Sequence, residues 1–309
     1  MLRLSVLIPV AGRLSYLEDT LLSVLEAQGE GCRVIVVLDE PYADPWGLKE
    51  ELRFIEAGPG CPVGRAIQLG LAEVETPITF ILPSGHEVDP HWAEQAVEVF
   101  RDERVGAVVP LVVRHDSPGV VTAAGMGYRQ DVGRLVPLQA GVSCENTVFA
   151  RRTQILPHPA GAFFRTDCLR EIDLDPELGE EWILAAAGQG VQLAGYRTLL
   201  EPSSRVRSRN FARAADAFRD ARDAEAFFWH WWDGTPSLPA AARHVGQLLG
   251  RAVAALPRGE FLAELSGRLK GAGNVSRRSV AHPRHKMHGP HFSASRASSP
   301  RSAAQVGQG

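Results

Sequence analysis

The sequence has little cysteine, no long apolar run and, towards its C-terminal end, no acidic residue. Its four cysteines are widely scattered, and no two of them form a CxxC pair. They are Cys32, Cys61, Cys144 and Cys168. This spacing argues against a disulfide framework and against a zinc site, so we expect four reduced thiols. No apolar stretch approaches the roughly 18 residues of a membrane-spanning helix, and the start MLRLSVLIPV is too short for a secretory signal. We therefore expect a cytoplasmic protein.

The acid-free segment, residues 272–309, carries six arginines and lysines, whereas the whole chain has 33 basic and 36 acidic residues. Residues 1–271 therefore have a net charge of −9, which disfavours nucleic acid as a partner. The segment is rich in Ser, Gly, Pro and Ala and has little to bury, so we expect a disordered basic tail that could touch the inner face of the cell membrane. A metal could bind its regularly spaced histidines, although a solvated tail also explains them: His282, His285, His288 and His291.

Residues 1–113 predict alternating strands and helices. Apolar runs rich in branched residues are typical of strands buried on both faces of a parallel sheet, and they occur at residues 2–10, 33–38, 77–82 and 105–113. The segments between them predict helices over residues 15–31, 46–57, 63–74 and 90–100. This order predicts an α/β domain with a mostly parallel sheet.

The pattern changes after Arg114. Residues 114–159 are punctuated by Gly and Pro, as expected for a substrate-side lobe, and AGAFFR, a helix over WILAAAG and the run GYRTLLEP follow. Residues 211–271 predict C-terminal helices, the first over 211–232 and the second over 239–256. The aromatic cluster at 227–232 most simply packs in the core, but it could also close a cleft, dock a partner or rest on a membrane surface.

Several segments, in order, resemble the family 2 glycosyltransferases of the GT-A fold. These are SVLIPVAGRLSYLEDTLLSVL, VIVVLDE, GRAIQLGLAEVETPITFIL and DPHW. Later segments resemble the rhamnosyltransferase-like branch that builds bacterial surface polysaccharides, namely VGAVVPLVV, GVVTAAGMGY, PAGAFFRTDCL, AGYRTLLEPSSRV and RDARDAEAFFWHWW. The resemblance implies a GT-A domain over residues 1–210, with a nucleotide-binding half (1–113) and an acceptor half (114–210).

The resemblance also implies residues that bind a nucleotide-sugar donor. Backbone groups of Pro9, Val10 and Ala11 match the family's nucleoside contact. Asp39 matches the second acid of a pair that binds the base, and Leu38 replaces the first. Arg65 lies where a cation near a diphosphate would be useful. Asp39 could instead cap the following turn, and Arg65 could be an ordinary surface residue.

The family's metal-binding Asp-x-Asp is matched by Pro83-Ser84-Gly85, which has no carboxylate to hold a hard divalent cation. The resemblance therefore implies that Ser84 and Gly85 cradle donor atoms without a metal. Mg²⁺ or Mn²⁺ would require His86 and Glu87 as replacement ligands.

The family's later His is also missing, and the neighbouring stretch carries Arg205, Arg207 and Arg209 at alternate positions. On a strand these three side chains share one face. They could replace the metal as the counter-charge of the diphosphate, mark a nucleotide site that has decayed, or form a solvated edge.

An inverting transfer needs a base that takes the proton of the acceptor hydroxyl. The resemblance places this base in DPELGEEW, with Glu181 the first candidate and Glu180 the second. Two acids at a helix start also complement the helix dipole without any catalytic role.

Three functions follow from these residues. The first is transfer of a sugar, with inversion, from a nucleotide-diphosphate sugar to a glycan or lipid-linked acceptor. The second is a GT-A scaffold that has lost catalysis and serves as a binding or assembly subunit. The third is nucleotidyl transfer, for which PVAGR is a poor match to the required Gly-rich, cationic loop.

Overall fold

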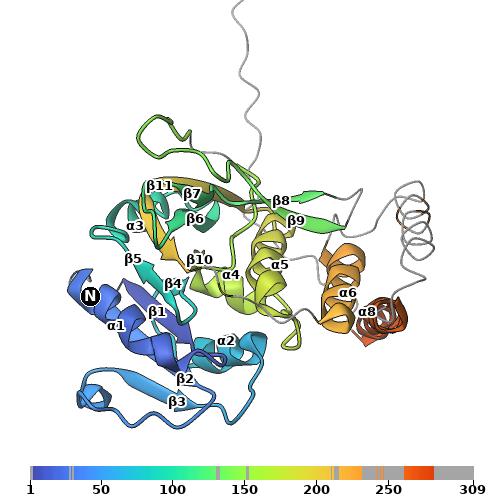
Figure 1. The fold of residues 1–309 in the computed structure, drawn as a ribbon, viewed down its shortest axis with the longest axis horizontal. Coiled ribbons are helices and arrows are strands. Elements are labelled where there is room, and N and C mark those ends of the chain that lie inside the picture. The colour runs from blue at the N-terminus through green and yellow to red at the C-terminus, as the bar shows by residue number, and fades with distance from the viewer. Residues whose placement is uncertain are drawn as a thin grey trace, which may run out of the picture.

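The computed structural model describes residues 3–27, 29, 31–129, 133–150, 153–209, 211, 216–231, 242, 244, 246 and 261–281. In these residues a nine-stranded sheet is flanked by helices on both faces, with a separate two-stranded ribbon beside it (Figure 1). The strands follow one another across the sheet in the order β3 (Arg53–Glu56), β2 (Cys32–Leu38), β1 (Leu4–Pro9), β4 (Ile78–Ile81), β10 (Ala162–Arg165), β6 (Val105–Arg114), β11 (Arg197–Ser208) and β5 (His86–Val88), and β7 (Val121–Ala123) pairs with β6.

The N-terminal half of the sheet is parallel, as predicted. β1 (Leu4–Pro9) lies between β2 (Cys32–Leu38) and β4 (Ile78–Ile81), and both pairings are parallel. Every residue of β1 and β4 is buried, because α1 (Leu17–Ala27) and α2 (Val63–Ala72) cover the sheet. Burial on both faces explains why these strands are almost entirely apolar. The carboxyl ends of the strands share one edge of the sheet.

The predicted helix over residues 46–57 is wrong. Gly47 has a left-handed φ of 66°, only a short 3-10 turn, η2 (Leu48–Glu50), follows it, and the Asp44 carboxylate accepts the backbone N–H groups of Leu48 and Lys49. The chain then forms β3 (Arg53–Glu56), parallel to β2. The open edge of β2 offers backbone groups that only a strand can pair, and this tertiary pairing overrides local helix propensity.

The second half of the sheet is mixed. The AGAFFR segment forms β10 (Ala162–Arg165), antiparallel to both β4 and β6 (Val105–Arg114). β11 (Arg197–Ser208) runs parallel to β6 and antiparallel to the short edge strand β5 (His86–Val88). β7 (Val121–Ala123) adds to β6, while β8 (Met126–Arg129) and β9 (Arg134–Pro137) form the ribbon. The helices α3 (Glu94–Val99), α4 (Thr166–Glu171) and α5 (Glu180–Leu193) complete this half.

The first C-terminal helix, α6 (Ala217–Ala226), begins later than the predicted Phe211, because the Asp216 carboxylate caps it by accepting the N–H of Arg219. It continues into the π-helical turn η3 (Phe227–Trp231), whose two phenylalanines, Phe227 and Phe228, are fully buried. Phe227 and Phe228 of the aromatic cluster therefore pack in the core. The helix predicted over 239–256 lies largely outside the described residues.

The last helix, α8 (Phe261–Ala281), packs on α6 around the buried carboxylate of Glu225. This carboxylate accepts from Trp229 Nε1 (2.7 Å) and Arg268 Nη1 (3.1 Å), and it contacts His244 Nε2 (3.0 Å). The hydrogen bonds offset the cost of burying the charge. α8 reaches Ala281, so the first ten residues of the segment expected to be disordered are helical, and the rest of that segment lies outside the described residues.

None of the helices in the described part of the chain combines the length and the apolar composition that a membrane span needs.

Candidate active site

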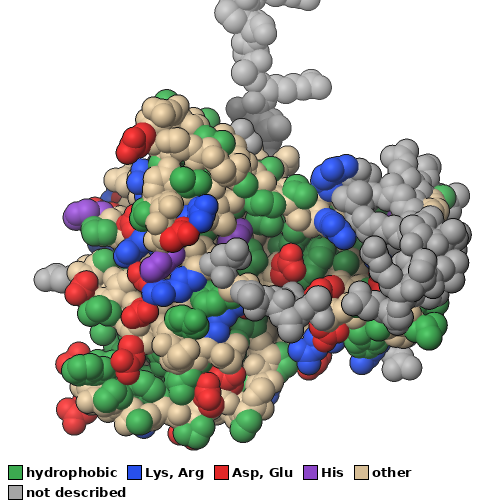
Figure 2. Space-filling model, viewed as in Figure 1, with side chains coloured by type: hydrophobic (Ala, Val, Ile, Leu, Met, Phe, Trp, Pro, Cys, Tyr) green, Lys and Arg blue, Asp and Glu red, His purple; other side chains and the backbone are tan. Residues whose placement is uncertain are grey.

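A cleft of about 1290 Å³ opens at the carboxyl ends of the parallel strands. Its walls come from the loop after β1, the residue after β2, the start of α2, the start of α5 and the first turns of α6. Figure 2 shows basic, acidic and histidine side chains intermixed around the hollowed part of this face. Ligands of open α/β sheets bind at this edge, so the cleft is the candidate active site.

Asp39 lines the cleft with one carboxylate oxygen unsatisfied. The residue is only 7% exposed, and its Oδ2 accepts the N–H of Gly12 at 2.6 Å. Its Oδ1 is also buried, and no described group donates to it. A buried carboxylate oxygen without a donor is costly. An N–H group of a ligand in the cleft could supply the missing hydrogen bond.

The Pro83-Ser84-Gly85 turn does not open into the cleft. Ser84 Oγ donates to the carbonyl of Arg13 (2.8 Å), and the Gly85 N–H donates to Thr20 Oγ1 (2.9 Å). The ring of Phe211 lies on Gly85 so closely that a Cβ there would be 2.3 Å from it. Ser84 and Gly85, which were expected to cradle donor atoms, therefore lie outside the cleft lining, because their polar groups are used within the protein and a ring covers the turn.

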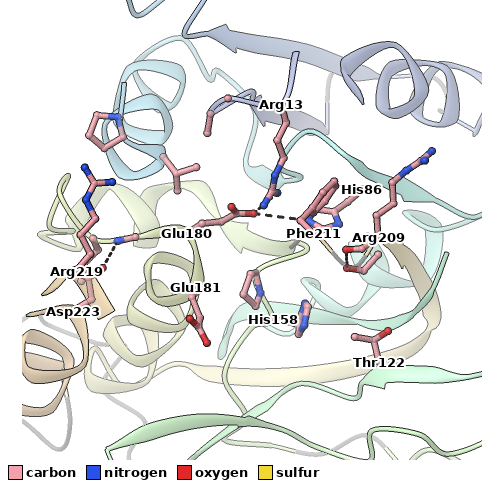
Figure 3. Close-up of a pocket in the computed structure, with 18 of the residues that line it drawn as sticks. Arg13, His86, Thr122, His158, Glu180, Glu181, Arg209, Phe211, Arg219 and Asp223 are labelled. Carbon is pink, nitrogen blue, oxygen red and sulfur yellow. Dashed lines mark hydrogen bonds and ion pairs between the residues drawn. The ribbon is translucent and has the colours of Figure 1, made fainter. Parts of the chain in front are cut away.

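Arg13 and Glu180 join the two sides of the cleft. Arg13 Nη1 donates to Glu180 Oε1 at 2.5 Å, and its guanidinium lies 4.0 Å above the centre of the Phe211 ring (Figure 3). Burial raises the pKa of Glu180, but the neighbouring His86 and the charge of Arg13 outweigh burial, so the pKa lies below its usual value. Glu180 is therefore a charged carboxylate that a cation already neutralises.

Glu181, the next residue of α5, also lines the cleft and is exposed. Figure 3 shows its carboxylate turned away from Arg13 and Glu180. Successive residues of a helix diverge by about 100°, which gives the two acids different surroundings. A hydrogen bond ties the start of α5 to α6, because the Gly179 N–H donates to Asp223 Oδ2 at 2.9 Å.

His86 and Glu87 lie on opposite faces of β5 and do not form a pair of ligands. His86 Nε2 is 4.0 Å from Glu180 Oε1, and burial lowers the pKa of this imidazole. Glu87 contacts His115 Nε2 (2.8 Å) and Arg209 Nη2 (2.6 Å) on the other face. Adjacent strand residues alternate, so the two cannot replace the metal ligands together. Among the described residues, no three His, Cys, Asp or Glu side chains converge on a point that could hold a metal ion.

Acids already pair with Arg207 of β11 and with Arg209, which follows this strand. Arg207 contacts Glu87 (3.3 Å) and Asp89 (2.9 Å), and it lies outside the cleft lining. Arg209 lines the cleft and donates to Asp19 as well as Glu87. Burial raises the pKa of Glu87, and the opposing effects of the Arg209 hydrogen bond and of the neighbouring His115 and Arg207 charges lower it overall. Of this cluster, Arg209 is placed to meet a ligand.

The cleft also contains His158, which the sequence patterns did not single out. Its Nδ1 accepts the N–H of Ala160 at 3.1 Å, so the proton of the neutral ring is on Nε2. Burial lowers the pKa of His158 to about 3. Arg13 and Phe211 were missed as well. The only sequence signal for His158 is a polar residue directly before PAGAFFR, and Phe211 has no signal because its contacts are with residues far away in the chain.

The predicted site residues divide into two groups. Those that line the cleft are Ala11, Asp39, His86, Glu180 and Glu181. Pro9 and Val10 do not, because they lie inside the sheet, where the Pro9 carbonyl accepts the Ser84 N–H and the Val10 N–H donates to Val37. Arg65 also lies outside the lining and contacts Gln68 on its own helix.

Comparison with known proteins shows which fold this is. Residues 5–138 match the model of glycosyl transferase family 2. GalNAc-T7, solved with UDP, GalNAc and Mn²⁺, has a TM-score of 0.58 and 14% identity over 94% of this chain and 58% of that one. The fold is that of the GT-A glycosyltransferases. The comparison with curated protein sequences found no match.

Two further GT-A structures are similar. The mannosyltransferase PcManGT from Pyrobaculum calidifontis, solved with GDP-Man and Mn²⁺, has a TM-score of 0.50 and 15% identity, over 91% of this chain and 88% of that one. TarS of S. aureus has a TM-score of 0.50 and 12% identity, over 82% of this chain and 44% of that one. This chain therefore spans a little over half of GalNAc-T7 and less than half of TarS.

Proposed function

We propose that the protein is a glycosyltransferase that moves a sugar, with inversion, from a nucleotide-diphosphate sugar to a hydroxyl of a glycan or lipid-linked acceptor. The observation that carries the proposal is the layout of the cleft. Its lining includes Asp39, one carboxylate oxygen of which is unsatisfied, and the acids Glu180 and Glu181. The first can select a base and the second can activate a hydroxyl, as this reaction requires.

In this proposal Asp39 Oδ1 accepts an N–H of the donor's base, beside the open backbone turn of Ala11 and Gly12. Both residues have positive φ, and nothing lies within 4 Å of a Cβ built on Gly12. The turn therefore leaves room for a flat base next to the carboxylate. A uracil, guanine or thymine ring each presents an N–H that could satisfy Asp39.

Arg13 and Arg209 would supply the positive charge that faces the diphosphate. The residues at the Pro83-Ser84-Gly85 turn do not fit a divalent cation, since the turn has no carboxylate and its polar groups bond within the protein. Arg13 lies beside this turn, because its carbonyl accepts the Ser84 hydroxyl and its guanidinium stacks on the ring that covers Gly85. Fixed guanidinium groups can stabilise a diphosphate leaving group.

Glu181 would act as the base. It takes the proton of the acceptor hydroxyl as the oxygen attacks the anomeric carbon, and the bond from that carbon to the diphosphate breaks, so that the nucleoside diphosphate leaves. Glu180 is the second candidate, but its lowered pKa makes it a weaker base. His158 lines the same cleft, and its Nε2–H can donate to a sugar hydroxyl.

A binding or assembly subunit without catalysis is the alternative function. The observation in its favour is that acids pair with the cations at the cleft: Arg13 with Glu180, and Arg209 with Asp19 and Glu87. A diphosphate would have to displace these partners. Such a subunit would keep the fold and lose donor affinity.

Calorimetric titration with UDP, GDP and dTDP sugars, each with Mn²⁺ and again with EDTA, distinguishes these functions. The transferase predicts that one base binds in EDTA and that Asp39→Asn weakens it by roughly tenfold or more. Asp167→Asn, which changes an exposed carboxylate on α4, is the matched control. Failure of every donor to bind to the folded protein would favour the subunit, and binding that requires Mn²⁺ would contradict the role of the arginines.

A further inference from the structure

The outer face of α8 carries an exposed stripe of three leucines. Leu262, Leu265 and Leu269 are 72%, 41% and 68% exposed, and their spacing of three and four places them on one side of the helix. The opposite side holds Gly267 and Gly271, which lie against the backbone of α6 at Phe218 and Arg222. The absence of side chains on these glycines lets the two helices approach closely. The leucine stripe therefore faces away from α6.

This stripe is separate from the candidate active site. α6 contributes Arg219, Arg222 and Asp223 to the cleft lining, and its backbone at Phe218 and its Glu225 pack against the glycines of α8. Figure 1 shows α8 at the outer edge of the molecule, beyond α6 and remote from the sheet. A surface bound to the leucine stripe would leave the cleft open.

The charge of the chain changes abruptly at α8. Residues 265–309 contain eight arginines and lysines and none of the 36 acids of the chain, so residues 1–264 carry a net charge of −11. Lys270 is exposed, with its Nζ 5.6 Å from the centre of the Phe218 ring of α6, and the sequence places Arg277 and Arg278 two turns farther along. Arg268 does not add to this surface, because it turns inward to Glu225 and Glu264.

We propose that α8 docks on an anionic lipid surface. Leu262, Leu265 and Leu269 enter the boundary between headgroups and acyl chains, while Lys270 and the basic residues that follow contact the anionic headgroups. A helix with an apolar face and adjacent lysines and arginines binds bilayers in this way, and each basic residue near the surface adds to the attraction. The proposal does not depend on the transfer reaction.

Two other occupants fit less well. Nucleic acid would match the charge but would leave three leucines without apolar contacts. A second copy of the chain offers no matching patch among the described residues, since its other exposed large hydrophobic residues stand on separate elements: Leu22, Trp46, Val148 and Leu193. Pairing of two α8 helices would bring like charges together.

Vesicle flotation of the full chain tests the proposal. We expect binding to vesicles that mix phosphatidylcholine with phosphatidylglycerol, no binding to phosphatidylcholine alone, and weaker binding at high salt. Replacing Leu262, Leu265 and Leu269 together by serine should lower the bound fraction about tenfold or more. Leu22→Ser removes an equally exposed leucine from α1 (57% exposed) and should change nothing. Circular dichroism and thermal unfolding should show that the variants are folded, because all four leucines are exposed.

Several outcomes would overturn the proposal. These are a folded wild-type protein that floats with neither vesicle, a triple variant that binds as well as the wild type, and equal binding to both vesicle types. A dimer that forms without vesicles and is lost in the triple variant would assign the face to self-association instead. A gel shift with RNA that is insensitive to the leucines would assign the charge to nucleic acid. Donor titration of the triple variant reports on the cleft independently.

Discussion

Arg13 donates a 2.5 Å hydrogen bond to Glu180, although the two residues are 167 positions apart in the chain. The contact connects the loop after β1 with the start of α5, on opposite sides of the cleft. It also couples the two proposed roles, because a cation that meets the diphosphate is the same cation that lowers the pKa of Glu180. The state of this pair decides which charges a donor encounters.

Replacing Arg13 by Gln should weaken the binding of a nucleoside diphosphate without affecting the nucleoside. A charge-assisted hydrogen bond contributes about 1.5–3 kcal/mol, so we expect an affinity loss of about tenfold or more for the diphosphate. Titration of both ligands in EDTA measures the difference. Arg101→Gln, at an exposed arginine paired with Glu98, is the control. Equal losses for nucleoside and diphosphate would show that Arg13 shapes the cleft and does not meet the phosphates.

Glu181→Gln and Glu180→Gln should have different effects. Loss of a general base lowers the rate by roughly 10²–10⁴, so Glu181→Gln should abolish most turnover and leave donor affinity unchanged. Glu180→Gln should instead raise donor affinity, because it releases the Arg13 guanidinium. Release of nucleotide from the donor that calorimetry identifies, with water as acceptor, gives the rate. If only Glu180→Gln slowed this release, Glu180 and not Glu181 would be the base.

Stability should fall in mild acid because of His158. An unfolded histidine has a pKa of about 6.5, whereas burial lowers that of folded His158 to about 3. Between these values the unfolded chain binds a proton that the folded protein does not, so the contribution is complete above pH 6.5 and is lost as the pH falls towards 3. In His158→Asn the Oδ1 can still accept the Ala160 N–H, and the melting temperature should depend less on pH between 5 and 7. The exposed His91→Asn should behave like the wild type. Identical pH profiles for all three proteins would refute the prediction.

Gly85→Ala should destabilise the protein more than Gly60→Ala. Both glycines have positive φ, +92° and +69°, which costs an alanine about 1–2 kcal/mol. At Gly60 nothing lies within 4 Å of the added Cβ, whereas at Gly85 it would meet Phe211 at 2.3 Å and add about 1–3 kcal/mol. Urea unfolding of both variants, alone and in a Phe211→Ala background, separates the two effects. If Phe211→Ala left the extra cost at Gly85 unchanged, the ring would not cover the turn in solution.

The strands were predictable where one local signal is sufficient. VIVVL is apolar at every position and ITFI at all but Thr79, and a short run of this kind satisfies its backbone and side chains only between two helical layers. The RFIE segment had no such signal. Its strand exists because β2 offers an open edge, and that edge cannot be read from the segment itself.

The candidate site was predictable to the same extent. Asp39 follows β2, whose carboxyl end lies at this edge of the sheet, whereas Glu180 and Glu181 at the start of α5 were proposed from the family resemblance; all three line the cleft. The side to which a neighbouring residue points was harder to predict. His86 and Glu87 are adjacent in the sequence, which suggested a pair of metal ligands. Because side chains alternate along a strand, His86 faces Glu180 whereas Glu87 faces Arg207 of β11.

The amino-acid sequence by itself determined the order of strands and helices in the parallel half of the sheet and the edge at which the acids gather. Only the tertiary structure decided that Phe211 covers the Gly85 turn, that Arg13 forms an ion pair with Glu180, and that the leucines of α8 are exposed to solvent. The reason is physical. Hydrophobic periodicity and secondary-structure propensity depend on residues that are close together in the chain. The contacts above depend on residues that are far apart in it, so no local pattern in the sequence reveals them.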